Sequence, residues 1–473
     1  MIRTHNPQTT LWTGFLKDEV SDLWEPWMRH ADELLDDAQL IDQVFEAQGR
    51  RCAKSRTRGR MQTPSEVVLR LLVLKHARDW SYQTLEREVR ANLVYRSFAR
   101  IGGEKVPDAK TMGRLGQAIG GAVIAQLHQR VVELAVEKKV VEGRRMRVDT
   151  TVVETNIHYP TDSSLLGDGA RVLTRLLKKV DDAVGGLKQQ VRDRMRTVRK
   201  KVVGMAIAAR RKGQAGEEQR KGLYKGLLRV TRQVVNQASR VAKEVAALPR
   251  KTQSKVQGLM EQLEVFKQRT QQVIRQTKAR IFDGNTQHPE KLVSMFEEHT
   301  EIIRKGKASK PTEFGKMVKV QEAENQIVTH FEVYEERPSD SDLLVASVET
   351  HEERLGRTPH LVAADAGFYS QANEKALEQK GVKRISIPNK HTKSEARRNV
   401  QKKRWFKNGQ RWRTGCEGRI SVLKRRHGLD RCLYPGMEGI KRWVGLGVIA
   451  DNLINIGLHM AVKMDEFSNQ APG

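Results

Sequence analysis

Apolar side chains recur at helical spacing through the first third of the chain. Residues 28–48 have the pattern of an acidic, amphipathic helix, and a basic stretch follows them. The sequence TPSE at 63–66 has the form of a capping box with Pro64 at the first helical position. Further helices are predicted to begin at Ser81 and at Asp108. Short helices joined by turns are typical of a helix-turn-helix-like module, although small helical bundles without a DNA partner share this pattern.

The pattern then changes to alternation. RRMRVDTTVVETN at 144–156 alternates, is rich in β-branched residues and is too short for a helix, so it predicts a strand that carries Asp149. Two alternating runs around a polar turn at 315–336 predict a β-hairpin. An apolar strand is predicted to end at Asp365, followed by a helix at 371–380 and a further short strand. The block after residue 406 is predicted to be helical and ends in a long apolar run.

A long helical stretch separates the first strand from the others. It covers residues 165–305, has few aromatic residues, and carries apolar residues at three and four spacing, as a helical hairpin or coiled coil does. Breaks are predicted at Gly185, near Gly213 and at Pro249. Residues 171–280 contain 29 Lys and Arg against 8 Asp and Glu, a net charge of +21. Such runs are usually the solvated face of a helix, but this imbalance exceeds what salt bridges within helices balance, so it favours an anionic partner.

These elements predict an α/β protein: a mixed sheet with a long α-helical insertion, preceded by an all-α N-terminal part that is helix-turn-helix-like. The expected organisation has four parts: a helical segment with a basic linker at 1–60, a helical DNA-binding domain at 61–140, a mixed α/β domain at 141–164 and 306–473, and the basic insertion at 165–305.

Composition narrows the class of partner. Among 473 residues, 86 Lys and Arg outnumber 57 Asp and Glu, and this net charge of +29 favours nucleic acid. A membrane is the rival, but no apolar run is expected to span one, and the first residues lack the pattern of a signal peptide. An intracellular, soluble protein is therefore expected. The three cysteines have no CxxC spacing, which indicates neither a zinc site nor a disulfide framework.

RTGCEGRISVLKRRHG at 413–428 places one carboxylate, Glu417, among cations. A general base, the hub of several salt bridges and a metal ligand all fit this local setting. On an ideal helix Arg413, Glu417 and Lys424 point within roughly 40° of one another. Asp149 lies in a strand pattern and Asp365 at the end of another; a lone Asp in such a place usually caps a turn or pairs with Arg. Together with Glu417 they have the composition of a site for two Mg²⁺ ions about 3.5–4 Å apart, which serves phosphodiester chemistry.

Three blocks in this order resemble the DDE transposases of bacterial insertion sequences. RVDTTVVETN is similar to the block around the first aspartate, ADAGFYS to the block around the second, and the spacing of Arg413, Glu417 and Lys424 to the signature around the glutamate. The N-terminal stretch ending in VPDAKTMGRL is similar to the helical N-terminal domain of these enzymes. One residue departs from the pattern, because Gln410 stands where a tyrosine often precedes the signature arginine by three residues.

The resemblance implies an RNase H-like catalytic domain in which Asp149, Asp365 and Glu417 are catalytic residues and bind two Mg²⁺ ions, which Mn²⁺ can replace. It implies a DNA transposase that binds the terminal inverted repeats of its own element, cleaves a strand at each end and joins the freed 3′-OH to target DNA. The residues expected to bind DNA are Arg413, Arg419, Lys424 and Arg425. Trp405 and Trp412 are expected to pack in the core rather than to stack on an extruded base.

Two ends must be brought together, so a homodimer or larger synaptic assembly on double-stranded DNA is expected, with no membrane partner. The expected location is the bacterial cytoplasm, in association with the nucleoid. Residues 60–120 are expected to discriminate the inverted repeat from random DNA. Two alternatives remain at this point: a catalytically inactive DNA-binding or architectural protein derived from a transposase, and a nuclease of the same fold that cuts without joining.

Overall fold

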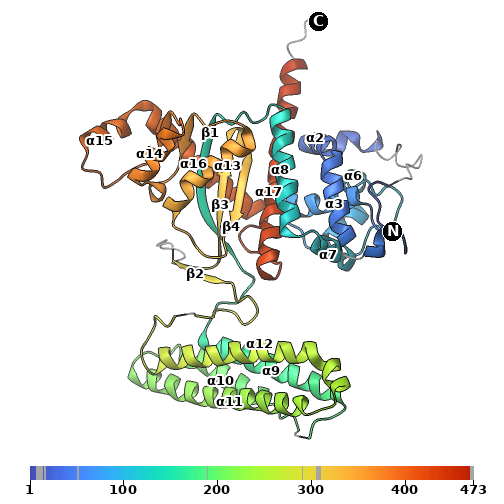
Figure 1. Cartoon of the computed structure of the whole chain (residues 1–473), viewed down its shortest axis with the longest axis vertical. Coiled ribbons are helices and arrows are strands. Elements are labelled where there is room, and N and C mark those ends of the chain that lie inside the picture. The colour runs from blue at the N-terminus through green and yellow to red at the C-terminus, as the bar shows by residue number, and fades with distance from the viewer. Residues whose placement is uncertain are drawn as a thin grey trace. The chain divides into compact units, whose positions relative to one another are not determined.

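The computed structural model describes residues 1–6, 14, 18–50, 53–188, 190–289, 291–304 and 311–468 (Figure 1). The chain forms two compact units, one of residues 1–156 with 305–473 and the other of residues 157–304. The second unit begins eight residues before the insertion expected from the sequence. The expected N-terminal and α/β domains lie in a single compact unit, because a shared apolar core joins them.

Helices form the N-terminal part of the larger unit, as predicted. They are α2 Pro26–Leu34, α3 Ala38–Arg50, α4 Ser65–Ala77, α5 Tyr82–Ala91, α6 Leu93–Phe98, α7 Ala109–Ala118 and α8 Gly121–Glu137. Helices predicted at Ser81 and Asp108 are confirmed by capping side chains, since Ser81 accepts a hydrogen bond from N of Thr84 at 3.0 Å and Asp108 accepts one from N of Thr111 at 2.9 Å. Each cap satisfies a backbone N–H group that a helix start leaves without a partner.

Two of the local predictions for this part were wrong. The single helix expected at 28–48 is two helices, because α2 ends at Leu34 before α3 begins at Ala38. The expected capping box does not form: Pro64 is the N-cap residue, and α4 starts at Ser65 without a side-chain cap. The Ser65 hydroxyl instead donates to Gln48 Oε1 at 2.7 Å. The Glu66 carboxylate, which the capping box would have used, also has a tertiary partner, because its Oε1 accepts a hydrogen bond from N of Asn6 at 2.6 Å.

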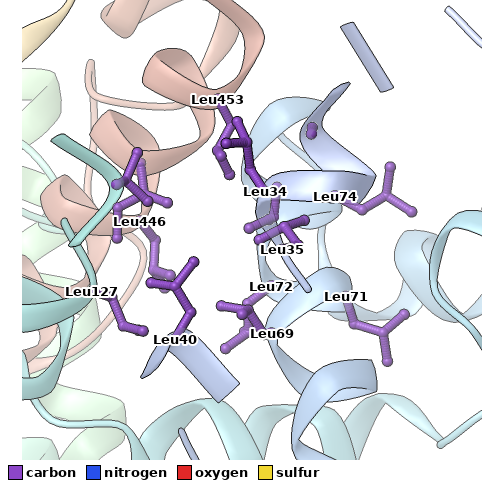
Figure 2. Packing of buried hydrophobic residues seen from close by; sticks show 14 of the residues in the cluster. Leu34, Leu35, Leu40, Leu69, Leu71, Leu72, Leu74, Leu127, Leu446 and Leu453 are labelled. Atoms are coloured by element: carbon purple, nitrogen blue, oxygen red, sulfur yellow. The ribbon is translucent and has the colours of Figure 1, made fainter. Parts of the chain in front are cut away.

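The apolar core of this part includes the C-terminal helix α17, Gly436–Ser468 (Figure 2). Leu446 and Leu453 of α17 lie near the leucines of the N-terminal helices, among them Leu34. Contrary to the expectation, Gly436–Met464 is long and apolar enough to cross a membrane, but 67% of its most apolar window is buried inside the protein. Packing in the core accounts for the apolar composition of this helix.

Five described strands of the larger unit form one mixed sheet in the order β4–β3–β1–β5–β6. They are β1 Arg145–Glu154, β3 Thr312–Glu322, β4 Val328–Val333, β5 Leu361–Ala363 and β6 Arg384–Ser386. Strands β1, β3 and β4 pair antiparallel, whereas β5 is parallel to β1 and β6 to β5. The predicted hairpin is confirmed, and the order is that of an RNase H-like sheet.

Helices cover both faces of this sheet: α13 Leu344–Leu355 and α14 Gln371–Gln379 on one, and α16 Arg404–Arg426 with α17 on the other; α15 is Glu395–Lys402. Alternation along β1 divides its side chains between these faces. Met146 and Val148 are fully buried in the core under α13 and α14. Arg147 and Asp149 face α16, where Arg147 donates to the backbone O of Trp412. The polar positions of β1 therefore meet the helix that carries Glu417.

The smaller unit is helical, as predicted, with α9 Asp162–Val184, α10 Met195–Ala208, α11 Gln214–Ala246 and α12 Arg250–Ile281, and it ends in strand β2, Glu301–Arg304. The predicted breaks are confirmed: Gly185 ends α9 with φ 85°, Gly213 precedes α11, and Pro249 is the N-cap of α12. A separate apolar core holds these helices together. Their charged side chains are consequently free to lie on the outside of the bundle.

Candidate active site

Asp149 lies in the middle of β1, paired in register with Val320 of β3. Its side chain is 16% exposed, and its Oδ1 accepts a hydrogen bond from N of Thr150 at 2.7 Å. Strand β1 pairs with β3 from Arg147 to Glu154, so hydrogen bonds to β3 hold the backbone before and after Asp149.

Asp365 follows β5, the parallel neighbour of β1. The sequence predicted that this strand ends at Asp365, but it ends at Ala363. Asp365 is instead the N-cap of the short 3-10 helix Ala366–Phe368. Its Oδ1 accepts from N of Gly367 at 2.7 Å. A Cβ atom at Gly367 would lie 3.0 Å from this same oxygen, so glycine permits the close turn. Side chains placed just past the carboxyl end of a parallel strand are a common source of site residues.

Glu417 lies on α16, which runs unbroken through Gly415 and Gly418. Arg413 is one turn earlier and donates from Nη2 to Glu417 Oε1 at 2.8 Å, while its Nη1 lies 3.8 Å from Asp149 Oδ2. One guanidinium thus bridges the helix acid and the strand acid. A Cβ atom at Gly415 would overlap the Arg147 guanidinium at 2.3 Å, so glycine lets α16 lie close against β1.

The three carboxylates share one electrostatic environment. Burial, together with the negative charges of Asp365 and Glu417, raises the pKa of Asp149 to about 6, against the opposing effects of the Thr150 hydrogen bond and Arg413. Each acid is therefore close enough to disfavour the charge on Asp149. Within the described part of the chain, no three carboxylate, imidazole or thiol groups already lie close enough to hold one ion. Asp365 and Glu417 thus lie within electrostatic range of Asp149, and Arg413 lies between Glu417 and Asp149.

Two family models match parts of this chain. A family model described as "Transposase DDE domain" matches residues 290–453, which include Asp365 and Glu417, and one described as "Transposase domain (DUF772)" matches residues 25–117. The chain belongs to the DDE transposases of insertion sequences. No curated protein and no solved structure matches it. Members of the family generally use divalent metal ions.

A buried ion pair between Arg147 on β1 and Glu322 on β3 lies next to the transposase site, and the sequence did not indicate this pair. Arg147 lies opposite Glu322 in the β1–β3 register and donates to both of its carboxylate oxygens, with Nε at 3.0 Å from Oε2. The guanidinium also lies 4.8 Å from the centre of the Trp412 ring. Beside the pair, burial raises the pKa of the Cys416 thiol. Arg147, which precedes Asp149 by two residues on the same face of β1, is thus held by β3, by α16 and by the Trp412 ring.

Two further polar residues of the transposase lie at the edge of the site. Gln410, at the position where tyrosine was expected, donates from Nε2 to O of Ala364 at 3.3 Å and to O of Ser386. It therefore joins the ends of β5 and β6 directly before Asp365. Asp340 accepts from Thr150 Oγ1 at 3.0 Å, and its Oδ2 is 3.2 Å from the Cβ position of Gly367. Sequence spacing gave no signal for Asp340, which begins the short 3-10 helix Asp340–Leu343 directly before α13.

The residues expected to bind DNA have different surroundings. Arg425 is exposed and Lys424 partly exposed. Arg419 requires a correction: its side chain is 5% exposed and donates from Nη1 to Asp451 Oδ1 at 2.7 Å inside the protein. A buried guanidinium committed to a carboxylate offers no surface to DNA. The two tryptophans are half-buried and belong to none of the described apolar cores: Trp405 packs on Phe406 with ring centres 5.6 Å apart, and Trp412 packs against the Arg147 guanidinium.

The pKa of Asp149 leads to a prediction for the metal-free protein. Because it lies at about 6 instead of 3.8, the folded state retains a proton between these pH values that the unfolded state has released. The free energy of unfolding should therefore fall as the pH rises from about 4 to about 6, by at most about 3 kcal/mol, and stay lower above that range. Urea unfolding in EDTA should show this fall in the wild type but not in Asp149→Asn. An identical pH dependence in the two proteins would contradict it.

Proposed function

We propose that this transposase binds the terminal inverted repeats of its own insertion sequence, cleaves a DNA strand at each end, and joins the freed 3′-OH to target DNA in a Mg²⁺-dependent reaction. The observation that carries the proposal is geometric: Arg413 on α16 joins Glu417 to Asp149 on the central strand β1 of an RNase H-like sheet, and the charges of Glu417 and Asp365 both act on Asp149. Cleavage and joining are both displacements at phosphorus, so a single site serves both steps.

The donor set fits a divalent cation. Carboxylate oxygens are the ligands that Mg²⁺ prefers. Burial and, to a smaller extent, repulsion by Asp365 and Glu417 disfavour the charge on Asp149, and a bound cation would offset both effects. Asp149, Asp365 and Glu417 would hold two Mg²⁺ ions, or Mn²⁺ in their place. Such ions supply an activated oxygen nucleophile and neutralise charge on the leaving oxygen. The affinity for metal should rise with pH as Asp149 loses its proton.

Arg413 has two functions in the proposal. Its Nη2 holds Glu417 beside Asp149, which orients the helix acid before metal arrives. Its side chain also lines an open pocket with Lys407 and Arg411, where the guanidinium would contact a phosphate oxygen. Lys424 and Arg425, further along the same helix, would hold the backbone of the reacting strand.

The net charge of +21 in residues 171–280 supports a second part of the proposal, in which the helical insertion holds the DNA backbone. On α10, Arg196, Arg199 and Lys200 are exposed and form no ion pair with another described residue. Their combined replacement by serine should make the slope of log affinity against log salt shallower by up to about 3, because each phosphate contact contributes about 0.9. Titration of a random duplex at several salt concentrations measures the slope.

The matched control replaces three exposed cations outside the insertion, Arg87, Arg90 and Lys375, by serine. Both triple variants lose the same formal charge, so a general effect of net charge would change both slopes equally. Equal slopes would contradict the assignment of backbone contacts to the insertion.

The proposal includes a homodimer or larger assembly, because two element ends must be held together for joining. It also includes action in the cytoplasm, on nucleoid DNA. The test uses the full chain, a duplex that carries the inverted repeat next to flanking DNA, and a supercoiled target. Nicking at the repeat boundary and a covalent joint to the target are the expected products with Mg²⁺. Nicking without a joint would indicate a nuclease, and binding without nicking would indicate an inactive DNA-binding protein.

A further inference from the structure

Helix α7 has one buried and one exposed face. Met112 and Leu115 are 3% and 5% exposed and pack in the N-terminal core. Lys110, Arg114 and Gln117 recur at helical spacing on the other face, and all three are exposed. Figure 1 shows α7 among the N-terminal helices. The exposed face thus consists of side chains with hydrogen-bond donors at their ends.

The cations of this face differ from those of the neighbouring helix α5. There Arg87 pairs with Glu88 at 2.7 Å and Arg90 with Glu86 at 3.4 Å. The side-chain hydrogen bond of Arg114 stays within its own helix, at 3.3 Å to O of Lys110, and among the described residues it forms no such ion pair. The donors of α7 are therefore available to a partner, whereas carboxylates on α5 neutralise its arginines.

A cavity of about 1100 Å³ adjoins the first turns of α7. Its cationic lining residues are Arg3, Arg58, Arg60, Lys105 and Arg114. The two carboxylates in the lining are already engaged, Glu104 with Arg3 at 3.3 Å and Asp108 as the N-cap of α7. Because both carboxylates of the lining already have partners, a ligand in the cavity would meet mainly positively charged side chains.

Two buried donors in this cavity have no acceptor among the described residues. Gln48 is 2% exposed, and its Oε1 accepts from Ser65 while its Nε2 has no partner. The Nε of Arg3 is likewise buried and unpaired. Buried N–H groups are seldom left without an acceptor, so these donors indicate a ligand that carries acceptor oxygens. A phosphate group of nucleic acid has that chemistry and also the negative charge that the cations require.

We infer that α7 is the recognition helix for the terminal inverted repeat, and that the cavity holds a backbone phosphate at the edge of the same groove. The major groove of DNA, about 12 Å wide, admits one helix. Arg114 has the donors to contact a guanine edge, and Gln117 has the paired donor and acceptor that an adenine edge requires. Phosphate contacts in the cavity fix the register of α7 without reading the sequence. The inference rests on the proposed function, since the DNA concerned is the end of the element.

The experiment measures binding separately from cleavage. Fluorescence anisotropy with Ca²⁺ in place of Mg²⁺ gives the Kd of the full-length protein for the inverted-repeat duplex and for a scrambled duplex of equal length. The α7 variants are Arg114→Ala and Gln117→Ala, and the cavity variant is Arg60→Ser. Arg87→Ala on α5 is the matched control, because it removes an exposed arginine of a neighbouring helix. Thermal unfolding of each variant confirms that these exposed substitutions leave the fold intact.

Each α7 variant should lower the ratio of the two affinities by about 5-fold to about 150-fold, the discrimination that one good base contact supplies. Arg60→Ser should weaken binding to both duplexes equally, and Arg87→Ala should preserve both affinities. Undiminished discrimination in both α7 variants would overturn the inference and leave the proposed function intact. Equal binding of both duplexes by the wild type would overturn inverted-repeat recognition itself, and with it the role of α7.

Discussion

Glu417→Gln should abolish strand cleavage and joining while the protein still folds and binds DNA. The substitution removes an anionic oxygen and keeps the volume of the side chain, and α16 holds this position on its exposed side, at 56% exposure. Metal ions contribute several kcal/mol to such a reaction, so the rate should fall at least about 10³-fold. Asp149→Asn and Asp365→Asn should behave in the same way. Product formation on an inverted-repeat duplex with Mg²⁺ measures the rate.

The control for this prediction is Glu395→Gln on α15, an exposed carboxylate on the helix that precedes α16. It should keep wild-type cleavage. If Glu417 were only a salt-bridge partner of Arg413, the variant would keep its activity in proportion to the fraction folded, and its thermal midpoint would fall. Cleavage within a few-fold of wild type in Glu417→Gln would therefore contradict the catalytic assignment and favour a binding protein.

Arg147→Met should have the largest effect on stability. The side chain is 6% exposed and Glu322 is fully buried, so the substitution leaves a carboxylate in the interior without its cation. Breaking such a pair costs about 3–5 kcal/mol. The loss also frees the O atom of Trp412, and with it a contact between α16 and β1. Urea unfolding followed by tryptophan fluorescence should show a lower midpoint for this variant.

Two further variants distinguish the cost of leaving Glu322 buried without its cation from the cost of replacing an arginine near Trp412. Arg145→Met removes an exposed arginine that lies 5.4 Å from the same Trp412 ring, and it should cost no more than about 1 kcal/mol. The double variant Arg147→Met with Glu322→Met leaves no buried charge and should recover most of the loss. A double variant as unstable as Arg147→Met would show that the pair itself, and not the unpaired charge, stabilises the sheet.

Local patterns of the sequence determined most elements of this transposase. Period-two alternation predicted β1 and the hairpin of β3 and β4, and helical spacing with Gly and Pro breaks predicted the insertion. Local hydrogen bonding by Ser81 and Asp108 sets the starts of α5 and α7, and the spacing of Arg413 and Glu417 on α16 places them one turn apart. These features depend on interactions between residues a few positions apart, which a single sequence displays directly.

Contacts between distant segments were decided only by the tertiary structure. The pairing of Arg147 with Glu322 depends on the β1–β3 register, the interior place of Arg419 depends on Asp451, and the burial of α17 depends on helices from the other end of the chain. The elevated pKa of Asp149 likewise requires burial together with acids from two other elements. Desolvation and long-range charge interactions depend on which segments contact one another in the folded protein. Local sequence patterns do not show which distant segments make these contacts.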